Sequence, residues 1–289
     1  MSDAPASAAG AWIRTRLASL TPRERAAVRH ILSMPGFGEE TSLEAVAEGA
    51  GVSQALVVKI AKKLDYAGFR DLRRGLAAYR RSETAALHAE IEPADGPAEI
   101  VAKVCRTTVQ AIEETRAILD MGAFEAAARA VAGARRLDLY GLGGSAQIAR
   151  DAAHKFLRIG RRAAVHDDAH MMLMSASVMG PEDVVLAISH SGATRAVLEP
   201  ARLARARGAT VLALTNFATS PLTEIAHVSL CSTAQGSALL GENAAARVAQ
   251  LVLLDALFAA VAQGDGLAAL DALDRTTRAV RGKRGEGDP

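Results

Sequence analysis

The feature that most constrains the fold is a series of short apolar runs that alternate with helical segments between residues 135 and 262. The longest runs, at 183–188 and 210–214, are apolar along nearly their whole length rather than at every second position, which predicts strands that are buried on both faces. Strands of this kind, joined by helices, form a mostly parallel sheet with helices on both sides. We therefore expect an α/β/α sandwich whose five strands cover residues 137–140, 163–165, 183–188, 210–214 and 227–230.

Loops rich in glycine and serine follow the first and third predicted strands. The first loop is Gly141-Leu142-Gly143-Gly144-Ser145, the second is Ser189-His190-Ser191-Gly192-Ala193-Thr194, and each opens a predicted helix. Backbone amides in such turns, together with the helix N-terminus behind them, favour an anion. Ligands of an open parallel sheet collect at the carboxyl ends of its strands. The two loops therefore predict a phosphate site at this edge.

The first loop alone also fits a dinucleotide-binding domain. Gly141, Gly143 and Ala146 match the glycine fingerprint of that fold, and Asp167 or Asp168 follows the second strand where a ribose-binding acid is expected. The second loop argues against this alternative, because a dinucleotide fold needs no hydroxyl-rich phosphate loop after its third strand.

The N-terminal segment predicts an all-α domain that contains a helix-turn-helix without a wing. Ser53 is expected to cap the second helix of the pair, which covers residues 54–64. A helix-turn-helix needs a small residue where its helices touch and a glycine where its turn is left-handed. Ala47 and Gly51 stand at the spacing that these two roles require.

The outward face of this second helix suits the major groove of DNA. Gln54 can pair with adenine, and Lys59 with guanine or with phosphate. Small apolar side chains on the same face suit a thymine methyl, and further lysines suit backbone phosphates, which position a protein without giving it sequence preference. The predicted DNA-binding residues are Ser53, Gln54, Ala55, Val58, Lys59, Lys62 and Lys63.

The charge distribution agrees with a polyanion-binding N-terminal part. The 289 residues have a net charge of +2, but residues 1–81 contain 13 Lys/Arg and 8 Asp/Glu, a net charge of +5, and the remainder has a net charge of −3. A basic module on a slightly acidic body is expected when only that module meets nucleic acid. Chance scatter of charged residues is the alternative interpretation of this count.

Three short runs of the N-terminal segment carry a resemblance to a known family. They are Leu20 to Arg25, Gly51 to Ser53, and Lys63-Leu64 followed by Gly68-Phe69. These runs resemble the N-terminal domain of the RpiR family of regulators, which implies DNA binding. Family members typically carry glycine where this chain has Asp65, and aspartate tolerates left-handed backbone better than most residues.

The second glycine- and serine-rich loop carries another resemblance. Residues 189–194 resemble the SxSGxT motif of sugar isomerase (SIS) domains, and the likeness extends over residues 135–261. This resemblance implies that the loops hold the phosphate of a sugar phosphate. The stretches 141–145 and 167–170 are also similar to those family members that regulate N-acetylmuramic acid catabolism. The expected effector-binding residues are Gly143, Ser145, Ser189, His190, Ser191, Thr194 and, from its position before the last long helix, Glu242.

SIS domains also occur in aldose–ketose isomerases and in an etherase, so an enzyme is the alternative function. Isomerisation needs a base near the sugar, and the candidates are Glu242, His170, His190 and His227. For Glu242, His170 and His227, a carboxylate at a helix N-terminus and a packing or surface histidine are the favoured explanations. An enzyme also has little use for a basic DNA-binding domain. We therefore expect no catalytic residue, no metal and no cofactor.

The sequence thus predicts a multi-domain regulator whose operator binding is modulated by a phosphorylated sugar. Its expected partners are double-stranded operator DNA, a sugar-phosphate effector and further copies of itself in a dimer or tetramer. Cys105 and Cys231 lack metal-ligand spacing, and no apolar run reaches the roughly 18–20 residues of a membrane span, so we expect a cytoplasmic location and no membrane partner. The expected parts are a helix-turn-helix domain at 1–81, a linker and connecting helix at 82–120, an SIS sugar-phosphate-binding domain at 121–265 and a C-terminal tail at 266–289.

Overall fold

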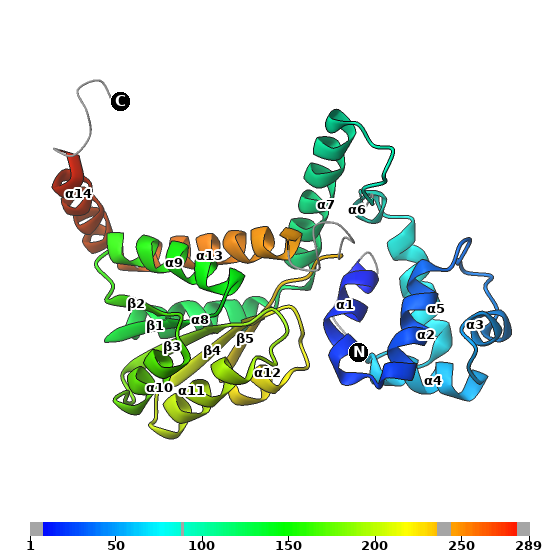
Figure 1. Cartoon of the computed structure of the whole chain (residues 1–289), viewed down its shortest axis with the longest axis horizontal. Coiled ribbons are helices and arrows are strands. Elements are labelled where there is room, and N and C mark those ends of the chain that lie inside the picture. The colour runs from blue at the N-terminus through cyan, green and yellow to red at the C-terminus, as the bar shows by residue number, and fades with distance from the viewer. Residues whose placement is uncertain (1–7, 88–89, 236–243, 282–289) are drawn as a thin grey trace. The chain divides into compact units, whose positions relative to one another are not determined.

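The computed structural model describes residues 8–87, 90–235 and 244–281, and the chain divides into two compact units. Unit 1 contains the N-terminal helices and two short segments from later in the chain, and unit 2 contains the sheet (Figure 1). Unit 1 comprises residues 1–119, 216–220 and 231–249, and unit 2 comprises residues 120–215, 221–230 and 250–289.

Helices account for nearly all the regular structure of unit 1. Helix α2 begins with a reciprocal capping box formed by Thr21 and Glu24, and Pro22 occupies its first position. The linker expected after residue 81 contains one short helix. The elements are α1 (Ala9–Arg16), η2 (Leu17–Ser19), α2 (Pro22–Ser33), α3 (Leu43–Gly49), α4 (Gln54–Lys63), α5 (Phe69–Arg80), α6 (Glu83–Ala86) and α7 (Pro97–Ile118).

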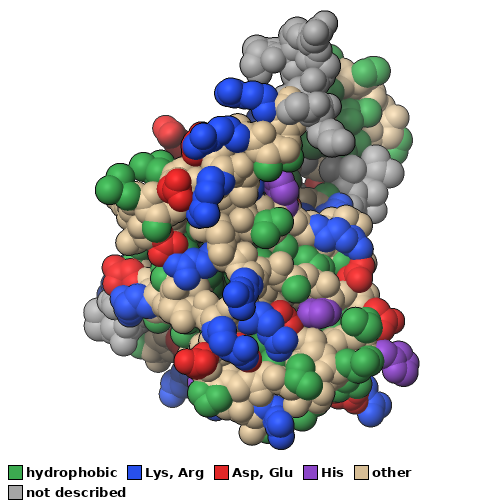
Figure 2. All heavy atoms as spheres, turned by 90° about the vertical axis from the view of Figure 1, so that its left-hand side faces the viewer, with side chains coloured by type: hydrophobic (Ala, Val, Ile, Leu, Met, Phe, Trp, Pro, Cys, Tyr) green, Lys and Arg blue, Asp and Glu red, His purple; other side chains and the backbone are tan. Residues whose placement is uncertain are grey.

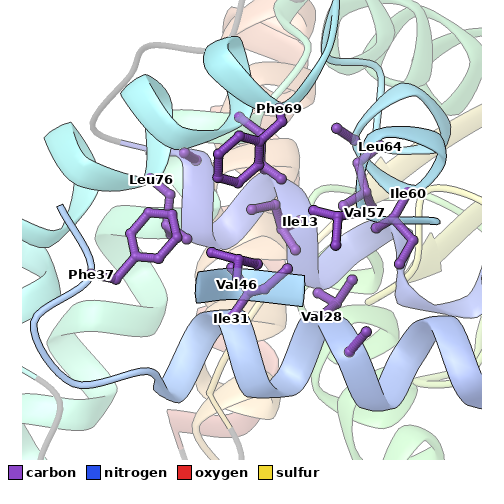
Figure 3. Packing of buried hydrophobic residues seen from close by; sticks show 14 of the residues in the cluster. Ile13, Val28, Ile31, Phe37, Val46, Val57, Ile60, Leu64, Phe69 and Leu76 are labelled. Atoms are coloured by element: carbon purple, nitrogen blue, oxygen red, sulfur yellow. The ribbon is translucent and has the colours of Figure 1, made fainter. Parts of the chain in front are cut away.

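The core of the N-terminal helices draws one or more large apolar side chains from each of α1 to α5. Figure 3 shows these side chains pointing toward a common centre, with Phe37 contributed by the segment between α2 and α3. Three residues of the helix-turn-helix, Val46, Val57 and Ile60, are completely buried there, as the sequence pattern predicts. The reading helix α4 is therefore held by its inner face, which leaves its outer face free for a ligand.

The C-terminal end of α2 is fastened by one arginine of α5. The guanidinium of Arg80 donates hydrogen bonds to the backbone carbonyls of Ile31 (3.2 Å), Leu32 (2.7 Å) and Met34 (2.6 Å). The last carbonyls of a helix have no partner within the helix, so this contact satisfies groups that would otherwise lose their hydrogen bonds.

The other end of α2 is joined to α4 by an ion pair whose carboxylate is buried. The ammonium of Lys63 donates to both carboxylate oxygens of Glu24 at 2.8 Å, and Glu24 is only 3% exposed. These hydrogen bonds, and the backbone amide of Thr21, hold the pKa of the Glu24 carboxyl below its ordinary range. The pair lies between residues 39 positions apart in the sequence, so it fixes how α4 lies on α2.

Unit 2 is built on a five-stranded sheet in the order β2-β1-β3-β4-β5, and the pairs β1–β2, β1–β3 and β3–β4 are parallel. The expected five-stranded sheet is confirmed. Helices α8 and α12 were not expected, and the predicted tail contains a helix, α14. The elements are α8 (Met121–Gly133), β1 (Arg136–Tyr140), α9 (Gly144–Arg158), β2 (Ala163–His166), α10 (Ala169–Ser177), β3 (Asp183–Ile188), α11 (Arg195–Ala206), β4 (Thr210–Thr215), α12 (Pro221–Ile225), β5 (Val228–Cys231), α13 (Ala244–Asp265) and α14 (Leu267–Arg281).

Helices cover both faces of this sheet. On one face, Met172 of α10 and Val197 of α11 pack against alternate strand residues such as Val185 and Val211. Helices α9 and α13 lie on the opposite face (Figure 1), where Phe156 and Phe258 make an edge-to-face contact. The expected α/β/α sandwich is therefore present.

Helix α13 is long and apolar enough, by length and composition alone, to cross a membrane, with a hydropathy of 1.8 in its most apolar window. This differs from the expectation that no apolar run reaches the length of a membrane span. Core helices of soluble proteins pass the same test. Within unit 2, Leu253, Leu254 and Leu257 of α13 are buried and Asp255 pairs with Lys155 of α9, so this part of the helix packs as a core helix does.

Replacing Lys63 with Met should lower the free energy of unfolding by about 1–3 kcal/mol at pH 7, because the Glu24 carboxylate would remain buried without its donor. A carboxyl group with a lowered pKa contributes stability above its ordinary pKa, and that contribution disappears as the pH falls below about 4. Denaturant unfolding of Lys63→Met and wild type should therefore differ most at pH 7 and least at pH 3.

Lys62→Met is the matched control, because Lys62 is exposed on the same helix and forms no ion pair within the described residues. Equal losses for the two variants at pH 7 would contradict a structural role for the Glu24–Lys63 pair.

Candidate DNA-reading helix and phosphate-binding loops

The turn between α3 and α4 has the geometry that a helix-turn-helix requires. Gly51 has a φ of 63°, and hydrogen bonds run from the amide of Val52 to the carbonyl of Ala47 (2.9 Å) and from the amide of Gly51 to the carbonyl of Glu48 (3.1 Å). This pair of bonds is a Schellman motif, which closes a helix on a left-handed residue. Ala47 is 5% exposed. The roles expected of Ala47 and Gly51 are thus confirmed.

The turn after α4 repeats this geometry with aspartate in place of glycine. Asp65 has a φ of 67°, and the amide of Tyr66 donates to the carbonyl of Ala61 at 3.0 Å. A left-handed conformation costs an L-residue about 1–2 kcal/mol. The carboxylate of Asp65 accepts a hydrogen bond from Arg16 Nε at 2.9 Å, and the guanidinium of Arg16 lies over the ring of Trp12. These contacts offset the conformational cost and tie α1 to the end of the reading helix.

Most of the predicted DNA-binding side chains lie on the exposed face of α4 or at its first turn. Ser53, Gln54, Ala55, Lys59 and Lys62 are all exposed, and the Ser53 hydroxyl also caps the helix by accepting from the amide of Leu56.

Two members of the predicted set have other contacts. Val58 is half-buried and packs against the core, and Lys63 is bound to Glu24. Two arginines of α5 are similarly engaged, since Arg73 donates to the carbonyl of Thr41 and Arg74 pairs with Asp71. The freely exposed cations of α4 are therefore Lys59 and Lys62.

Many basic side chains of unit 2 are paired with acidic ones. Figure 2 shows one face of the molecule on which Lys and Arg side chains gather with Asp and Glu beside them. The ion pairs of this unit include Arg150–Asp167, Lys155–Asp255 and Arg161–Asp265. Pairing of this kind neutralises much of the positive charge that would attract a polyanion.

The two glycine- and serine-rich loops lie at the switch point of the sheet. Strands β1 and β3 are neighbours, but the chain passes from β1 to β2 on one side and from β3 to β4 on the other. Ligands of open α/β sheets bind in the crevice outside such a point. Because Tyr140 pairs with Ala187, the loops that follow the two strands begin at nearly the same level of the sheet.

The first loop allows a close approach of backbone to backbone. A Cβ atom at Gly141 would lie 3.0 Å from the backbone of Ser145, and Gly143 has a φ of 55°. Only glycine fits both positions without strain. Tyr140, which precedes the loop, is buried, and burial raises the pKa of its hydroxyl to about 12. That hydroxyl donates to Ser175 of α10 and anchors the end of β1.

The second loop is held by its own hydroxyl groups. The hydroxyls of Ser189 and Thr194 lie 3.1 Å apart, and the Ser191 hydroxyl accepts from the amide of Ala193 at 3.2 Å. Gly192 has a φ of 60°, which turns the backbone toward α11. The loop thus brings together three of the hydroxyl groups that the sequence predicts to hold phosphate, on a single tight turn.

The helices behind these two loops begin without side-chain caps. No side chain accepts from the first amides of α9 or of α11, and Thr194, at the cap position of α11, directs its hydroxyl to Ser189 instead. By contrast, Asp168 caps α10 after β2, with bonds to the amides of His170 and Met171. Uncapped amides at a helix N-terminus are donors that an anion can use.

The acidic residues proposed for the dinucleotide alternative are occupied differently. Asp168 is the cap of α10, and Asp167 forms an ion pair with Arg150 of α9. Neither contact leaves the carboxylate arranged as a dedicated ribose acceptor, which agrees with the argument from the second loop.

Three of the residues considered as an isomerase base, His170, His190 and His227, lie in the part of the chain that the structure describes. His170 is exposed, and His227 Nδ1 accepts a hydrogen bond from the amide of Val211 at 3.0 Å. Glu242 lies outside the described residues. Within the described residues, no group of three or more His, Cys, Asp or Glu side chains is placed to hold a metal ion.

The sequence reasoning assigned no role to Thr215, at the end of β4. Its hydroxyl donates to the backbone carbonyl of His190, at 3.1 Å, inside the second loop. The position of Thr215 at the carboxyl end of a neighbouring strand was the available signal, since such residues line the same edge of the sheet.

Comparison with known proteins identifies both parts of the chain. Residues 9–83 match the helix-turn-helix domain of the rpiR family, and residues 130–260 match the SIS domain. Over 252 residues the chain is 39% identical to the HTH-type transcriptional regulator RpiR of Escherichia coli strain K12, which covers 87% of this chain and 85% of that protein. It is 32% identical over 253 residues to an uncharacterized HTH-type transcriptional regulator of Caldanaerobacter subterraneus, covering 88% of this chain and 90% of that protein.

Two solved structures share the fold. The NanR protein of Vibrio vulnificus, complexed with ManNAc-6P, aligns with a TM-score of 0.62 at 24% identity and covers 95% of this chain and 98% of that chain. The sugar isomerase domain of an RpiR transcription factor from Sphaerobacter thermophilus aligns with a TM-score of 0.58 at 23% identity, covering 62% of this chain and 98% of that chain. With its helix-turn-helix, its SIS-type sheet and these full-length relatives, the chain belongs to the RpiR family of helix-turn-helix transcriptional regulators.

Proposed function

We propose that this regulator binds a phosphorylated sugar at the two loops after β1 and β3, and that the bound sugar changes its affinity for operator DNA. The observation that carries the proposal is the pair of uncapped helices, α9 and α11, at the switch point of the sheet. Their first amides and the hydroxyls of Ser189, Ser191 and Thr194 supply several donors to one small region.

The donors have separate roles in this proposal. Ser191 and Thr194 bind phosphate oxygens directly, and Ser189 holds Thr194 in place through their 3.1 Å contact. Gly143 and Ser145 present the second set of donors from the start of α9. His190 lines the loop and Glu242 reaches a sugar hydroxyl. The structurally similar NanR protein of Vibrio vulnificus, which was solved in complex with ManNAc-6P, supports a phosphosugar as the ligand class.

We further propose that α4 reads DNA through Gln54 and Lys59, with Ala55 beside them and Lys62 on a phosphate. Ser53 stands at the helix N-terminus, where a recognition helix meets base edges. Lys63 supports this helix through Glu24 rather than by contact with DNA. Val58 shapes the inner edge of the same face.

We propose that the protein acts in the cytoplasm as a dimer or tetramer, because the two half-sites of an operator are bound by two helix-turn-helix domains. Residues 1–81 form the DNA-binding domain, residues 82–120 the linker and connecting helix, and residues 121–265 the sensor. The segment 266–289, which begins with α14, follows the sensor.

We propose that the SIS domain senses its ligand and does not convert it. The regulators to which the chain is similar support this interpretation. Incubation of the pure protein with a panel of aldose and ketose phosphates should leave them unchanged, as followed by NMR. Turnover that Glu242→Gln abolishes would instead establish an isomerase.

The double substitution Ser191→Ala with Thr194→Ala should weaken sugar-phosphate binding by more than tenfold, because a hydrogen bond to a charged group contributes about 1.5–3 kcal/mol. Thermal shift against a sugar-phosphate panel that includes ManNAc-6P identifies a ligand of the wild type, and calorimetry then measures both proteins. DNA affinity without ligand should stay unchanged.

Ser177→Ala is the control for this experiment, since Ser177 donates to the carbonyl of Met174 at the end of α10, away from both loops. Undiminished ligand binding by the double variant would show that the phosphate site lies elsewhere.

Gln54→Ala should reduce discrimination at one adenine position of the operator by about 1–3 kcal/mol. Lys62→Ala should weaken binding to all sequences alike and lower the salt slope of binding by about 1, because one phosphate contact is lost. Fluorescence anisotropy with a fragment of the protein's own promoter region and with single-base variants measures both effects.

Arg129→Ala removes one exposed charge from α8 and serves as the control for net charge. If Gln54→Ala binds every operator variant as the wild type does, α4 does not read bases through this residue.

A further inference from the structure

Helix α7, which connects the two domains along the chain, buries polar side chains in the second half of its length. Gln110 and Glu114 are each 1% exposed and Thr115 is 3% exposed. Buried polar groups are nearly always hydrogen-bonded, and a network of them is sensitive to the position of each member. The partners of these three residues therefore show what α7 is fixed to.

Two of these residues bind the N-terminal helices. The Glu114 carboxylate accepts hydrogen bonds from the Tyr79 hydroxyl (2.6 Å), from the Gln110 side chain (2.9 Å) and from the guanidinium of Arg14. Tyr79 belongs to α5 and Arg14 to α1, which are both part of the helix-turn-helix domain. Burial raises the pKa of the Tyr79 hydroxyl, which keeps it protonated as a donor. Glu114 thus joins α7 to the helix-turn-helix domain.

The next residue, Thr115, binds a segment that follows the last strand of the sheet. Its hydroxyl accepts from the backbone amide of Thr233 at 3.0 Å and donates to the carbonyl of the same residue at 3.2 Å. Thr233 is 2% exposed and, like α7, belongs to unit 1. One hydroxyl therefore satisfies both backbone groups of Thr233.

The same segment is bound to the residue after β4. The hydroxyl of Ser232, which is completely buried, donates to the side-chain carbonyl of Asn216 at 2.8 Å. Asn216 follows Thr215, whose hydroxyl donates to the carbonyl of His190 in the second phosphate loop. A second bond from this region reaches α1, where the carbonyl of Thr15 accepts from the amide of Ala218 at 2.9 Å.

We infer that Thr115 is a positioning residue that couples the phosphate loop after β3 to the helix-turn-helix domain. The connection runs through hydrogen bonds and neighbouring residues in the order His190, Thr215, Asn216, Ser232, Thr233 and Thr115. This inference rests on the proposed sugar-phosphate site. When phosphate orders the loop, the His190 carbonyl moves, and Thr215 and Asn216 move with it to keep their bonds. Thr233 then shifts against Thr115, and the adjacent Glu114 carries the shift to Arg14 and Tyr79.

Coupling of this kind requires two arrangements to which the ligand binds with different affinity. The buried hydrogen bonds favour two distinct arrangements, because an intermediate position would leave a buried polar group without a partner. The alternative is that the Thr115–Thr233 contact only stabilises the fold. A purely structural contact would change the melting temperature but not the effect of ligand on DNA binding.

The test measures the ratio of operator dissociation constants with and without a sugar phosphate that binds the wild type, using full-length protein. Allosteric ratios are typically about 5-fold to 150-fold. Thr115→Val keeps the shape of the side chain but removes the hydroxyl, and it should reduce a ratio of about tenfold to about threefold or less. Its affinity for the sugar phosphate alone should stay within about twofold of wild type, roughly the scatter of such measurements.

Two matched variants on the same helix sharpen the result. Thr115→Ser keeps the hydroxyl and should retain the wild-type ratio. Thr108→Val makes the same chemical change at a residue whose hydroxyl donates to the Val104 carbonyl within α7, so it should also retain the ratio. If Thr115→Val fails to fold, Ser232→Ala breaks the next bond of the series and should reduce the ratio in the same way.

The outcomes separate this inference from the proposed function. If Thr115→Val and Ser232→Ala both keep the wild-type ratio of operator dissociation constants, the role of Thr115 is overturned, whereas the proposed sensor function stands. A wild type that binds DNA and sugar phosphate with a ratio of one overturns regulation itself and the inference with it.

Discussion

Backbone donors at a helix N-terminus need hydrogen-bond partners, and the proposed phosphate site lies where two helices begin without a side-chain cap. Most helices in the described structure that begin with a polar cap satisfy their first amides internally, as Ser42, Ser53, Asp120 and Asp168 do. Helices α9 and α11 have no side-chain cap, and both begin at the switch point between β1 and β3. Because β1 and β3 are neighbours in the parallel sheet, these two N-termini lie at the same edge, which is where we propose the phosphate site.

The helix-turn-helix depends in the same way on hydrogen-bond partners at helix C-termini. Gly51 and Asp65 both adopt left-handed backbone so that the last carbonyls of α3 and α4 are satisfied. For glycine this conformation is free of steric cost, whereas Asp65 needs the contact with Arg16 to offset it. The reading helix is thus bounded by two closed turns, and the Glu24–Lys63 pair fixes its orientation on α2.

Features that depend on a few neighbouring residues could be predicted from the sequence. The five strands, the positions of the two glycine- and serine-rich loops and the left-handed turn at Gly51 depend on short stretches of sequence, because burial, steric freedom and helix starts act over a few residues. Helix α8 escaped prediction because its alanine-rich sequence has few large apolar anchors. The Glu24–Lys63 pair and the Arg14–Glu114 contact join residues 39 and 100 positions apart, and no local pattern specifies such partners.

The composition of the phosphate loops also bears on how a sensor can release its ligand. Neither loop, at 141–145 or 189–194, contains Lys or Arg, and Arg195, the first residue of α11, is exposed and paired with Glu199. In the proposed site these loops offer amides, hydroxyls and His190, and neutral donors bind phosphate more weakly than a charged clamp. A regulator must exchange its effector as concentrations change, and a ligand can shift a two-state equilibrium only by its difference in affinity for the two states. Neutral donors on a tight loop meet both requirements, because the affinity then depends on loop geometry. In the coupling that we infer, the hydrogen bond from Thr215 to His190 transmits that geometry.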